Sequence, residues 1–174
     1  IPSKDWAIVK VTNSAKLISE NSHTLLGAIV DTGSELFVQD ANYITDIESG
    51  QSLTVTKYLK LDGHLDLVSG SQLIQTTGSI FDPASTGYLE RDQQGKSKIY
   101  SYNYWSSPVY PTISSFNNAL YSVSSILKSG IDADNPLDIN FTSVGYDGST
   151  DGEIMTVADY WIWKYTSQPD AYAN

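Results

Sequence analysis

Short apolar segments recur along the first half of the chain, and turn residues separate them. Their spacing is roughly six to nine residues, and most contain two or three apolar side chains. The segments are Leu36–Val38, Tyr43–Ile44, Leu53–Val55, Leu59–Leu61, Leu65–Leu67, Leu73–Ile74, Ile80–Phe81 and Tyr88–Leu89. This pattern predicts strands of about four residues joined by tight corners.

A longer period emerges when every third segment is compared. The spacing is 23 positions from Leu36 to Leu59, 21 from Leu59 to Ile80, 21 from Ile44 to Leu65 and 20 from Leu53 to Leu73. A rung of about 21 residues predicts a three-sided, right-handed parallel β-solenoid, whose inward side chains form apolar columns. Glycines lie where the corners should fall, at positions 33, 50, 63, 70 and 78.

The residues before this region fit the same architecture less regularly. Apolar positions at Ile8–Val11 and Leu17–Ile18 predict an earlier rung within residues 6–19. An antiparallel meander is the alternative, because its strands are also short and evenly spaced. The very short strands favour the solenoid.

The pattern changes at the polar stretch Glu90–Lys96, which predicts a boundary between a solenoid over residues 1–95 and a second unit over 96–174. Alternating aromatic residues up to Trp105 predict a strand that Pro108 ends. A helical face within Phe116–Leu127 predicts a short helix.

The last apolar segment, Ile154–Tyr165, predicts a strand buried on both faces. The second half should therefore be a small β-rich, sandwich-like unit. We expect it to cap the solenoid, because an open coil end invites edge-to-edge pairing.

Composition narrows the class of protein. Hydrophobic residues make up 40% of the chain, which excludes a disordered tail, and the net charge is −10. Phosphate backbones and anionic lipids repel so acidic a chain, so we expect no binding to nucleic acid or to a membrane surface. The sequence has no run of 18 apolar residues, so we also expect no membrane insertion. The absence of cysteine excludes thiolate metal sites and disulfides. The terminal residues Ile1–Ser3 and Asp170–Asn174 suggest a fragment of a longer protein.

Several segments resemble repeats of large secreted proteins of Bacteroidota. They are Tyr58–Leu67, Ser71–Gln75, Gly87–Gly95, Tyr102–Val109 and Asp159–Lys164. The resemblance covers roughly residues 50–165 and implies a parent chain exported by the type IX secretion system. It assigns no catalytic role to any residue.

Catalytic motifs are missing, and we expect no enzyme. The sequence has no Gly-x-Ser-x-Gly elbow, no phosphate-binding glycine loop and no His-Glu-x-x-His motif. The two histidines are isolated in sequence, and His64 is expected at an exposed corner.

One acidic loop is a candidate calcium site. Asp147, Ser149, Asp151 and Glu153 offer oxygen atoms at alternate positions, with glycines between them, as at the start of a calcium-binding loop. The match fails at the twelfth position, which is Ala158. A solvated turn is the alternative, because these residue types are common in turns.

Aromatic residues of the second half are candidates for sugar binding. Exposed aromatic rings stack on sugar faces, and the candidates are Tyr102, Tyr104, Trp105, Trp161 and Trp163. The alternative is that at least half of these rings form the core of the second unit.

We therefore expect a structural or adhesive module of an extracellular, cell-surface protein. Its partners would be the rest of the parent polypeptide or a surface complex, and polysaccharide if the aromatic site exists. A carbohydrate-binding module is the first alternative. An accessory subunit of an outer-membrane or secretion complex is the second.

Overall fold

The computed structural model describes residues 4–46, 48–95, 101–105, 123–132, 135–145, 153–165 and 172–173. The chain forms two compact units, residues 1–109 and 110–174. The regular secondary structure of the described residues is almost all strand, with helical turns at α1 (Val123–Ile126) and η2 (Asp159–Trp161). An all-β fold with parallel sheets is therefore confirmed. No helix among the described residues is long and apolar enough to cross a membrane.

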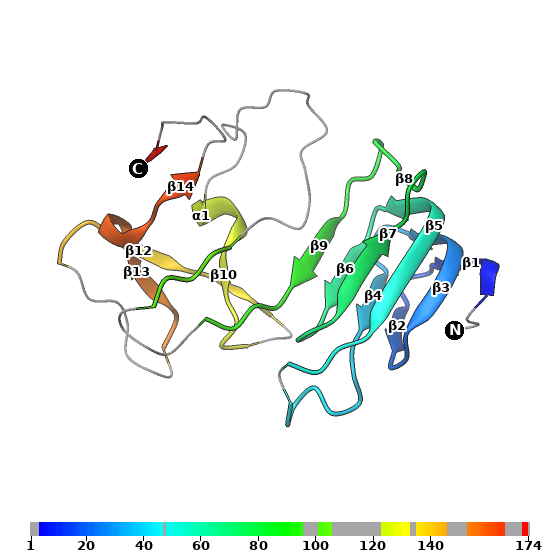
Figure 1. Ribbon diagram of the computed structural model, residues 1–174, viewed down its shortest axis with the longest axis horizontal. Helices are drawn as coiled ribbons and strands as arrows, with labels where there is room; N and C mark the ends of the chain where they lie inside the picture. Colours follow the sequence, from blue (N-terminus) through cyan, green and yellow to red (C-terminus); the bar gives the residue numbers. More distant parts are fainter. Residues whose placement is uncertain are drawn as a thin grey trace. The chain divides into compact units, whose positions relative to one another are not determined.

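Unit 1 consists of two parallel sheets, and the chain passes repeatedly from one to the other (Figure 1). The first sheet has the order β1-β3-β5-β7, with β8 also paired to β5, and the second has the order β2-β4-β6-β9. The strands are β1 (Lys4–Val11), β2 (Lys16–Ser19), β3 (His23–Val30), β4 (Glu35–Val38), β5 (Ser52–Leu61), β6 (His64–Leu67), β7 (Gln72–Gln75), β8 (Ile80–Phe81) and β9 (Tyr88–Arg91).

The first sheet is divided into two arms along its strands. The pairing of β3 with β5 shifts register between Leu25 and Gly27, and that of β1 with β3 shifts between Lys4 and Ile8. The two arms of β5 then pair with different strands: its beginning pairs with β7 and Tyr58–Leu59 pairs with β8. One irregularity thus recurs at the same place in successive strands.

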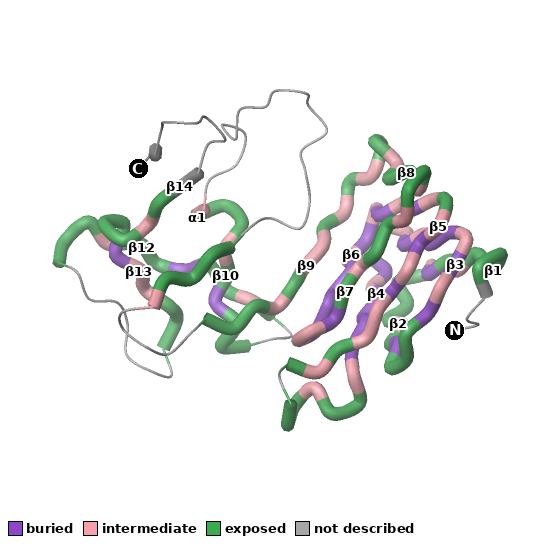
Figure 2. Tube along the Cα trace, in the orientation of Figure 1, coloured by how far each residue is buried: buried purple, intermediate pink, exposed green. Residues whose placement is uncertain are grey.

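The core lies between the inward faces of these sheets (Figure 2). In the second sheet, the register places Leu17, Leu36, Leu65 and Leu89 side by side. Successive side chains of a strand point to opposite faces, so one apolar residue in two is enough to build such a row. Leu36 and Leu65 are fully buried. Burial of these rows supplies the main stabilisation of the unit.

The predicted spacing is right in part. Leu53 pairs with Leu73 as predicted. Leu36, however, pairs with Leu65 and not with Leu59. Leu59 pairs with Phe81, one position beyond the predicted Ile80. Ile44 lies in a turn and is 77% exposed, so its predicted place in a column is wrong. The reason is a loop over residues 39–51, which lengthens one passage between the sheets without adding a strand.

As a result, the uniform period of about 21 residues is wrong for the second sheet. The separation is 19 positions from Leu17 to Leu36, 29 from Leu36 to Leu65 and 24 from Leu65 to Leu89. Loops of different length account for these unequal separations, because the pairing of strands does not constrain the length of the loops between them.

The sequence interpretation missed β3, although Leu25, Ala28 and Val30 are fully buried in it. The apolar pattern of β3 changes phase at Leu25–Gly27, where the register shifts, and this interrupts the alternation. A regular period of two therefore could not identify the strand.

One of the glycines predicted at corners, Gly63, lies at the corner between β5 and β6. A Cβ atom on Gly63 would lie 2.2 Å from the Ser34 carbonyl oxygen, and one on Gly87 would lie 2.0 Å from the Gly63 carbonyl oxygen. Successive corners thus stack backbone on backbone, with no room for a side chain. The Ser85 hydroxyl oxygen also accepts a hydrogen bond from the Leu61 amide at 3.0 Å.

Unit 2 contains three two-stranded sheets in its described part. Strand β10 pairs antiparallel with β11, β12 pairs parallel with β13, and β14 pairs antiparallel with β15. These strands are Lys128–Ser129, Leu137–Asp138, Asn140–Thr142, Thr156–Ala158, Lys164–Tyr165 and Tyr172–Ala173. The predicted sandwich and its capping role stay predictions.

Two local predictions for the second half are wrong. Residues 154–165 are not one buried strand, because η2 separates β13 from β14 and leaves Trp161 and Trp163 more than half exposed. Residues 101–105 form no strand and belong to unit 1. The predicted helix is present only as α1, and residues 116–122 lie outside the described residues.

Candidate functional site

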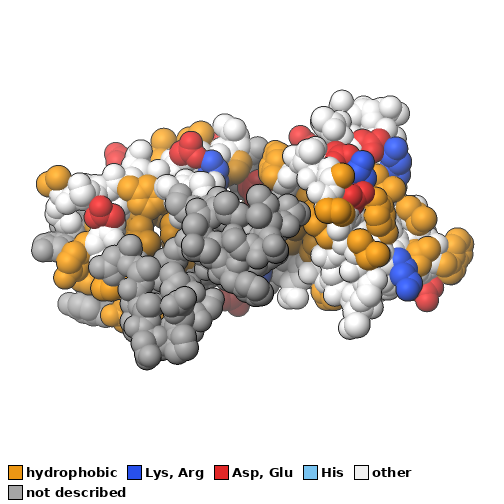
Figure 3. Space-filling view, turned by 90° about the horizontal axis from the view of Figure 1, so that it is seen from above, with side chains coloured by type: hydrophobic (Ala, Val, Ile, Leu, Met, Phe, Trp, Pro, Cys, Tyr) orange, Lys and Arg blue, Asp and Glu red, His pale blue; other side chains and the backbone are white. Residues whose placement is uncertain are grey.

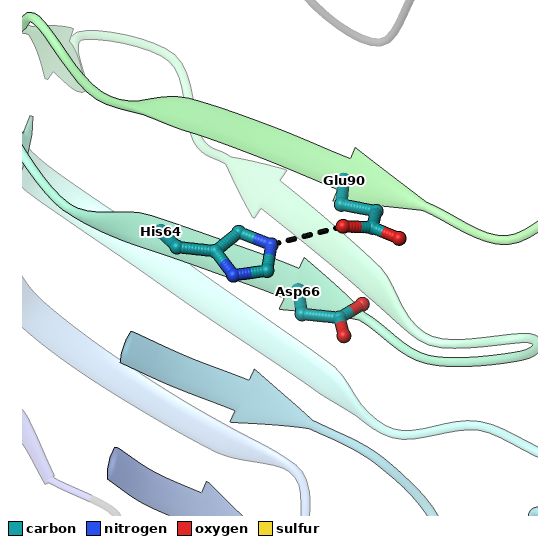
Figure 4. A group of neighbouring side chains, drawn as sticks. All are labelled: His64, Asp66 and Glu90. Carbon is teal, nitrogen blue, oxygen red and sulfur yellow. Dashed lines mark ion pairs between the residues drawn. The ribbon is translucent and has the colours of Figure 1, made fainter. Parts of the chain in front are cut away.

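Three titratable side chains meet on the outward face of the second sheet, where β6 pairs with β9 (Figure 4). His64 and Asp66 lie two positions apart on β6, so they point to the same face, and Leu65 between them points into the core. The register pairs Asp66 with Glu90 on β9. Strand alternation and parallel pairing therefore bring the three side chains together.

The three side chains could share one ion. One ligand atom from each residue can be chosen so that all three lie within 4.8 Å of one another. His64 Nε2 lies 3.1 Å from Glu90 Oε2, but it makes no hydrogen bond of ordinary geometry. Asp66 Oδ1 is also buried without a hydrogen-bond partner. Two buried polar atoms are thus unsatisfied in the same cluster, which is uncommon in folded proteins.

Aromatic rings fix the orientation of the imidazole. The His64 ring stacks on Tyr88 with a centroid distance of 4.3 Å and an interplanar angle of 21°. Phe37 meets the same imidazole edge-on at 5.8 Å, and Lys16 Nζ lies 3.8 Å from the centroid of the Phe37 ring. These contacts hold His64 in place without satisfying Nε2.

The cluster has an excess of negative charge. Burial, together with the nearby carboxylates of Glu90 and Asp92, raises the pKa of Asp66 to about 7, against the opposing effect of His64 and Lys16. Burial also raises the pKa of Asp92, although the Ser69 amide donates a hydrogen bond to it at 2.9 Å. A cation placed here would relieve this repulsion.

The predicted aromatic site residues are exposed but belong to two units. Tyr102, Tyr104 and Trp105 lie in unit 1, and Trp161 and Trp163 lie in unit 2. Each of the five is at least 41% exposed, so the alternative that at least half of them form the core of the second unit is wrong. In unit 2 the ring of Tyr160 also packs edge-on against Trp161 at 4.8 Å.

The predicted calcium loop falls mostly outside the described residues. Asp147, Ser149 and Asp151 are among the residues that are not described, while Glu153 is exposed. Calcium binding by this loop stays a prediction.

The sequence interpretation missed the cluster on β6 and β9. Its expectation of an exposed corner for His64 is wrong, because the side chain lies on β6 and is only 13% exposed. The alternation His64-Leu65-Asp66 was an available signal. Glu90 could not be assigned to it, because a period of 21 positions from Asp66 ends at Gly87, whereas the actual register requires 24.

Comparison with known proteins identifies no relative: no family model, curated protein or solved structure matches this chain. Function must therefore be argued from the residues and the fold alone.

Proposed function

We propose that this chain is a structural or adhesive module of a longer extracellular protein, with a β-solenoid as its first unit. The observation that supports this is the parallel pairing of equivalent strands from β1–β2 to β7–β9, with aligned apolar rows inside. The two arms of the first sheet and the second sheet would be its three sides. A right-handed path is the one that parallel crossover connections almost always take.

Such a coil suits a spacer, because each rung binds only its neighbours and a rod can be lengthened without a new core. The paired strands leave β1 and β2 at one edge of the two sheets, and β7, β8 and β9 at the other. Unpaired backbone groups at such edges accept another strand. Further rungs of the parent polypeptide would meet this requirement.

Apolar side chains on the outside of unit 1 support an adhesive role (Figure 3). The register places Ile8, Gly27, Tyr58 and Ile80 in one row across the first sheet. Ile8 and Ile80 are 62% and 60% exposed, and Trp6 nearby in sequence is 70% exposed. Contiguous apolar surface of this kind is typical of sites that contact another protein.

A test of the coil places a charge in its apolar interior. Leu67→Asp should unfold unit 1, because Leu67 is 2% exposed and a buried carboxylate without a partner is costly. The matched control is Ile44→Asp, at a position that is 77% exposed. Thermal melting followed by circular dichroism compares the variants with the parent. A Leu67→Asp variant that melts like the parent would show that the stacked-row architecture is wrong.

Carbohydrate binding is a second candidate function, favoured by the exposure of Trp161 and Trp163. Both rings are more than half exposed and lie two positions apart in the sequence, and the ring of Tyr160 packs against Trp161. Exposed rings of this kind can stack on sugar faces, and their burial against a ligand would recover apolar contact area.

A further inference from the structure

We propose that His64, Asp66 and Glu90 bind one divalent transition-metal ion, with Zn²⁺ as the ion that best fits the donor set. The site would connect β6 to β9, two neighbouring strands of the second sheet. This inference rests on the cluster alone and does not depend on the solenoid or on the role proposed for the whole chain.

The donor atoms match the preferences of zinc. Zn²⁺ binds imidazole nitrogen and carboxylate oxygen at about 2.0–2.2 Å, and sites with three protein ligands complete the tetrahedron with water. Such bond lengths place neighbouring ligand atoms about 3.4 Å apart. His64 Nε2 and Glu90 Oε2 are already 3.1 Å apart, and all three donors lie within 4.8 Å. A small side-chain rotation would therefore close the site.

Calcium and magnesium fit the cluster less well. Ca²⁺ takes six to eight oxygen ligands, and Mg²⁺ prefers an octahedron of oxygen atoms with several waters. An imidazole with two carboxylates offers a mixed nitrogen and oxygen set instead, which suits zinc and other first-row divalent ions.

Burial supplies an independent reason to expect a ligand. Asp66 is only 5% exposed, and its Oδ1 has no hydrogen-bond partner. His64 Nε2 is also buried without a hydrogen bond, on the side of the ring that faces Glu90 in Figure 4. A bound cation would satisfy both atoms, and a charge of +2 would balance the two carboxylates.

The site is oriented but still accessible. Stacking on Tyr88 and the edge contact with Phe37 hold the imidazole ring, which reduces the entropy lost when an ion binds. The Glu90 side chain is 20% exposed, so it offers the ion a path from solvent. A metal here would also fix β9, which has a partner strand on one side only among the described strands, to β6.

The test is zinc titration of the whole 174-residue chain after treatment with a chelator. Calorimetry with Zn²⁺ should give one site per chain, and an excess of Ca²⁺ should not weaken the binding of Zn²⁺ at this site. Because the chain has two histidines, ¹H–¹⁵N spectra of the imidazoles can resolve them. Zinc should shift the Nε2 signal of His64 and leave the signals of His23 in place.

Two variants remove one carboxylate each. Asp66→Asn and Glu90→Gln should each weaken zinc binding at least tenfold, since loss even of a residue that supports a metal ligand has effects of about 10- to 100-fold. Glu20→Gln is the matched control, because Glu20 is exposed and outside the cluster. Circular dichroism without metal verifies folding, and if Asp66→Asn does not fold, the partly exposed Glu90 carries the test.

Three results would overturn the proposal. They are a folded parent that does not bind zinc, binding that both carboxylate variants retain at full strength, and spectra in which zinc shifts His23 but not His64.

Discussion

At the scale of single residues, Asp66 is the most unusual side chain that the structure describes. It lies on the outward face of its sheet, where carboxylates normally contact water, yet it is 5% exposed. Its neighbours Glu90 and Asp92 carry the same charge. Burial and the neighbouring negative charges therefore favour the protonated form of Asp66 when no cation is bound.

This burial should give the metal-free protein a distinct pH dependence. The folded-state pKa of Asp66 is about 7, above its ordinary value of 3.8, so the folded state holds a proton that the unfolded chain has already released. The free energy of unfolding should therefore fall as pH rises from about 4 to 7 and then level off, with a contribution of at most about 4 kcal/mol.

Urea denaturation of the parent and of Asp66→Asn at several pH values, with chelator present, measures this contribution. The parent should lose stability relative to the variant between about pH 4 and 7. The carboxylates of Asp31 and Asp62 have lowered pKa values because of Lys10 and Lys60, so their contribution is lost only at more acidic pH and cancels in the comparison. A constant difference between parent and variant would contradict the argument.

At the scale of elements, the corners between strands restrict the amino-acid sequence as strictly as the strands do. The strands require apolar side chains at alternate positions, whereas the corner between β5 and β6 requires the absence of a side chain. Gly63 packs against the carbonyl group of Ser34 in the preceding corner, and Gly87 packs against the carbonyl group of Gly63. Successive corners can stack closely there only because both positions are glycine.

Gly63→Ala should consequently destabilise unit 1 by roughly 2–4 kcal/mol, because the new Cβ atom would overlap backbone that cannot move without breaking ladder hydrogen bonds. Gly130→Ala is the control, since a Cβ atom there meets nothing within 4 Å. Urea denaturation gives both values. If the two variants were equally stable, the corners would be more adaptable than their close contacts indicate.

At the scale of the whole molecule, the two units differ in how many of their described side chains are buried. Nearly all of the fully buried residues belong to unit 1, whereas the described part of unit 2 buries few apolar side chains and exposes several aromatic ones. This difference in burial motivates the proposal that unit 1 acts as a support and that unit 2 carries a binding surface.

A glycan array with the whole chain tests that division of roles. If unit 2 binds sugar, Trp161→Ala and Trp163→Ala should each abolish the signal or weaken it about tenfold, because a stacked ring contributes on the order of 1 kcal/mol or more. Ile44→Ala, an exposed apolar residue of unit 1, is the control. Repeating the array with a chelator separates a role for the Asp147 loop. No binding under either condition would exclude the carbohydrate function for the glycans on the array.

The sequence by itself determined most of the strand-forming segments of unit 1 and the all-β fold class, although it did not reveal β3. Leu36–Val38, Leu65–Leu67 and Leu73–Ile74 form strands as predicted, because local alternation and β propensity act within a few residues. The glycine corners were also predicted from local composition. Parallel stacking followed from the repetition of these segments.

Only the tertiary structure decided which segments pair. The loop over residues 39–51 and the register shift at Leu25–Gly27 change the spacing without changing the local pattern, so no fixed period could place Leu36 beside Leu65. The candidate metal site depends on the same registers. His64 and Asp66 are close in sequence, but Glu90 reaches them only through the pairing of β6 with β9, which long-range packing sets.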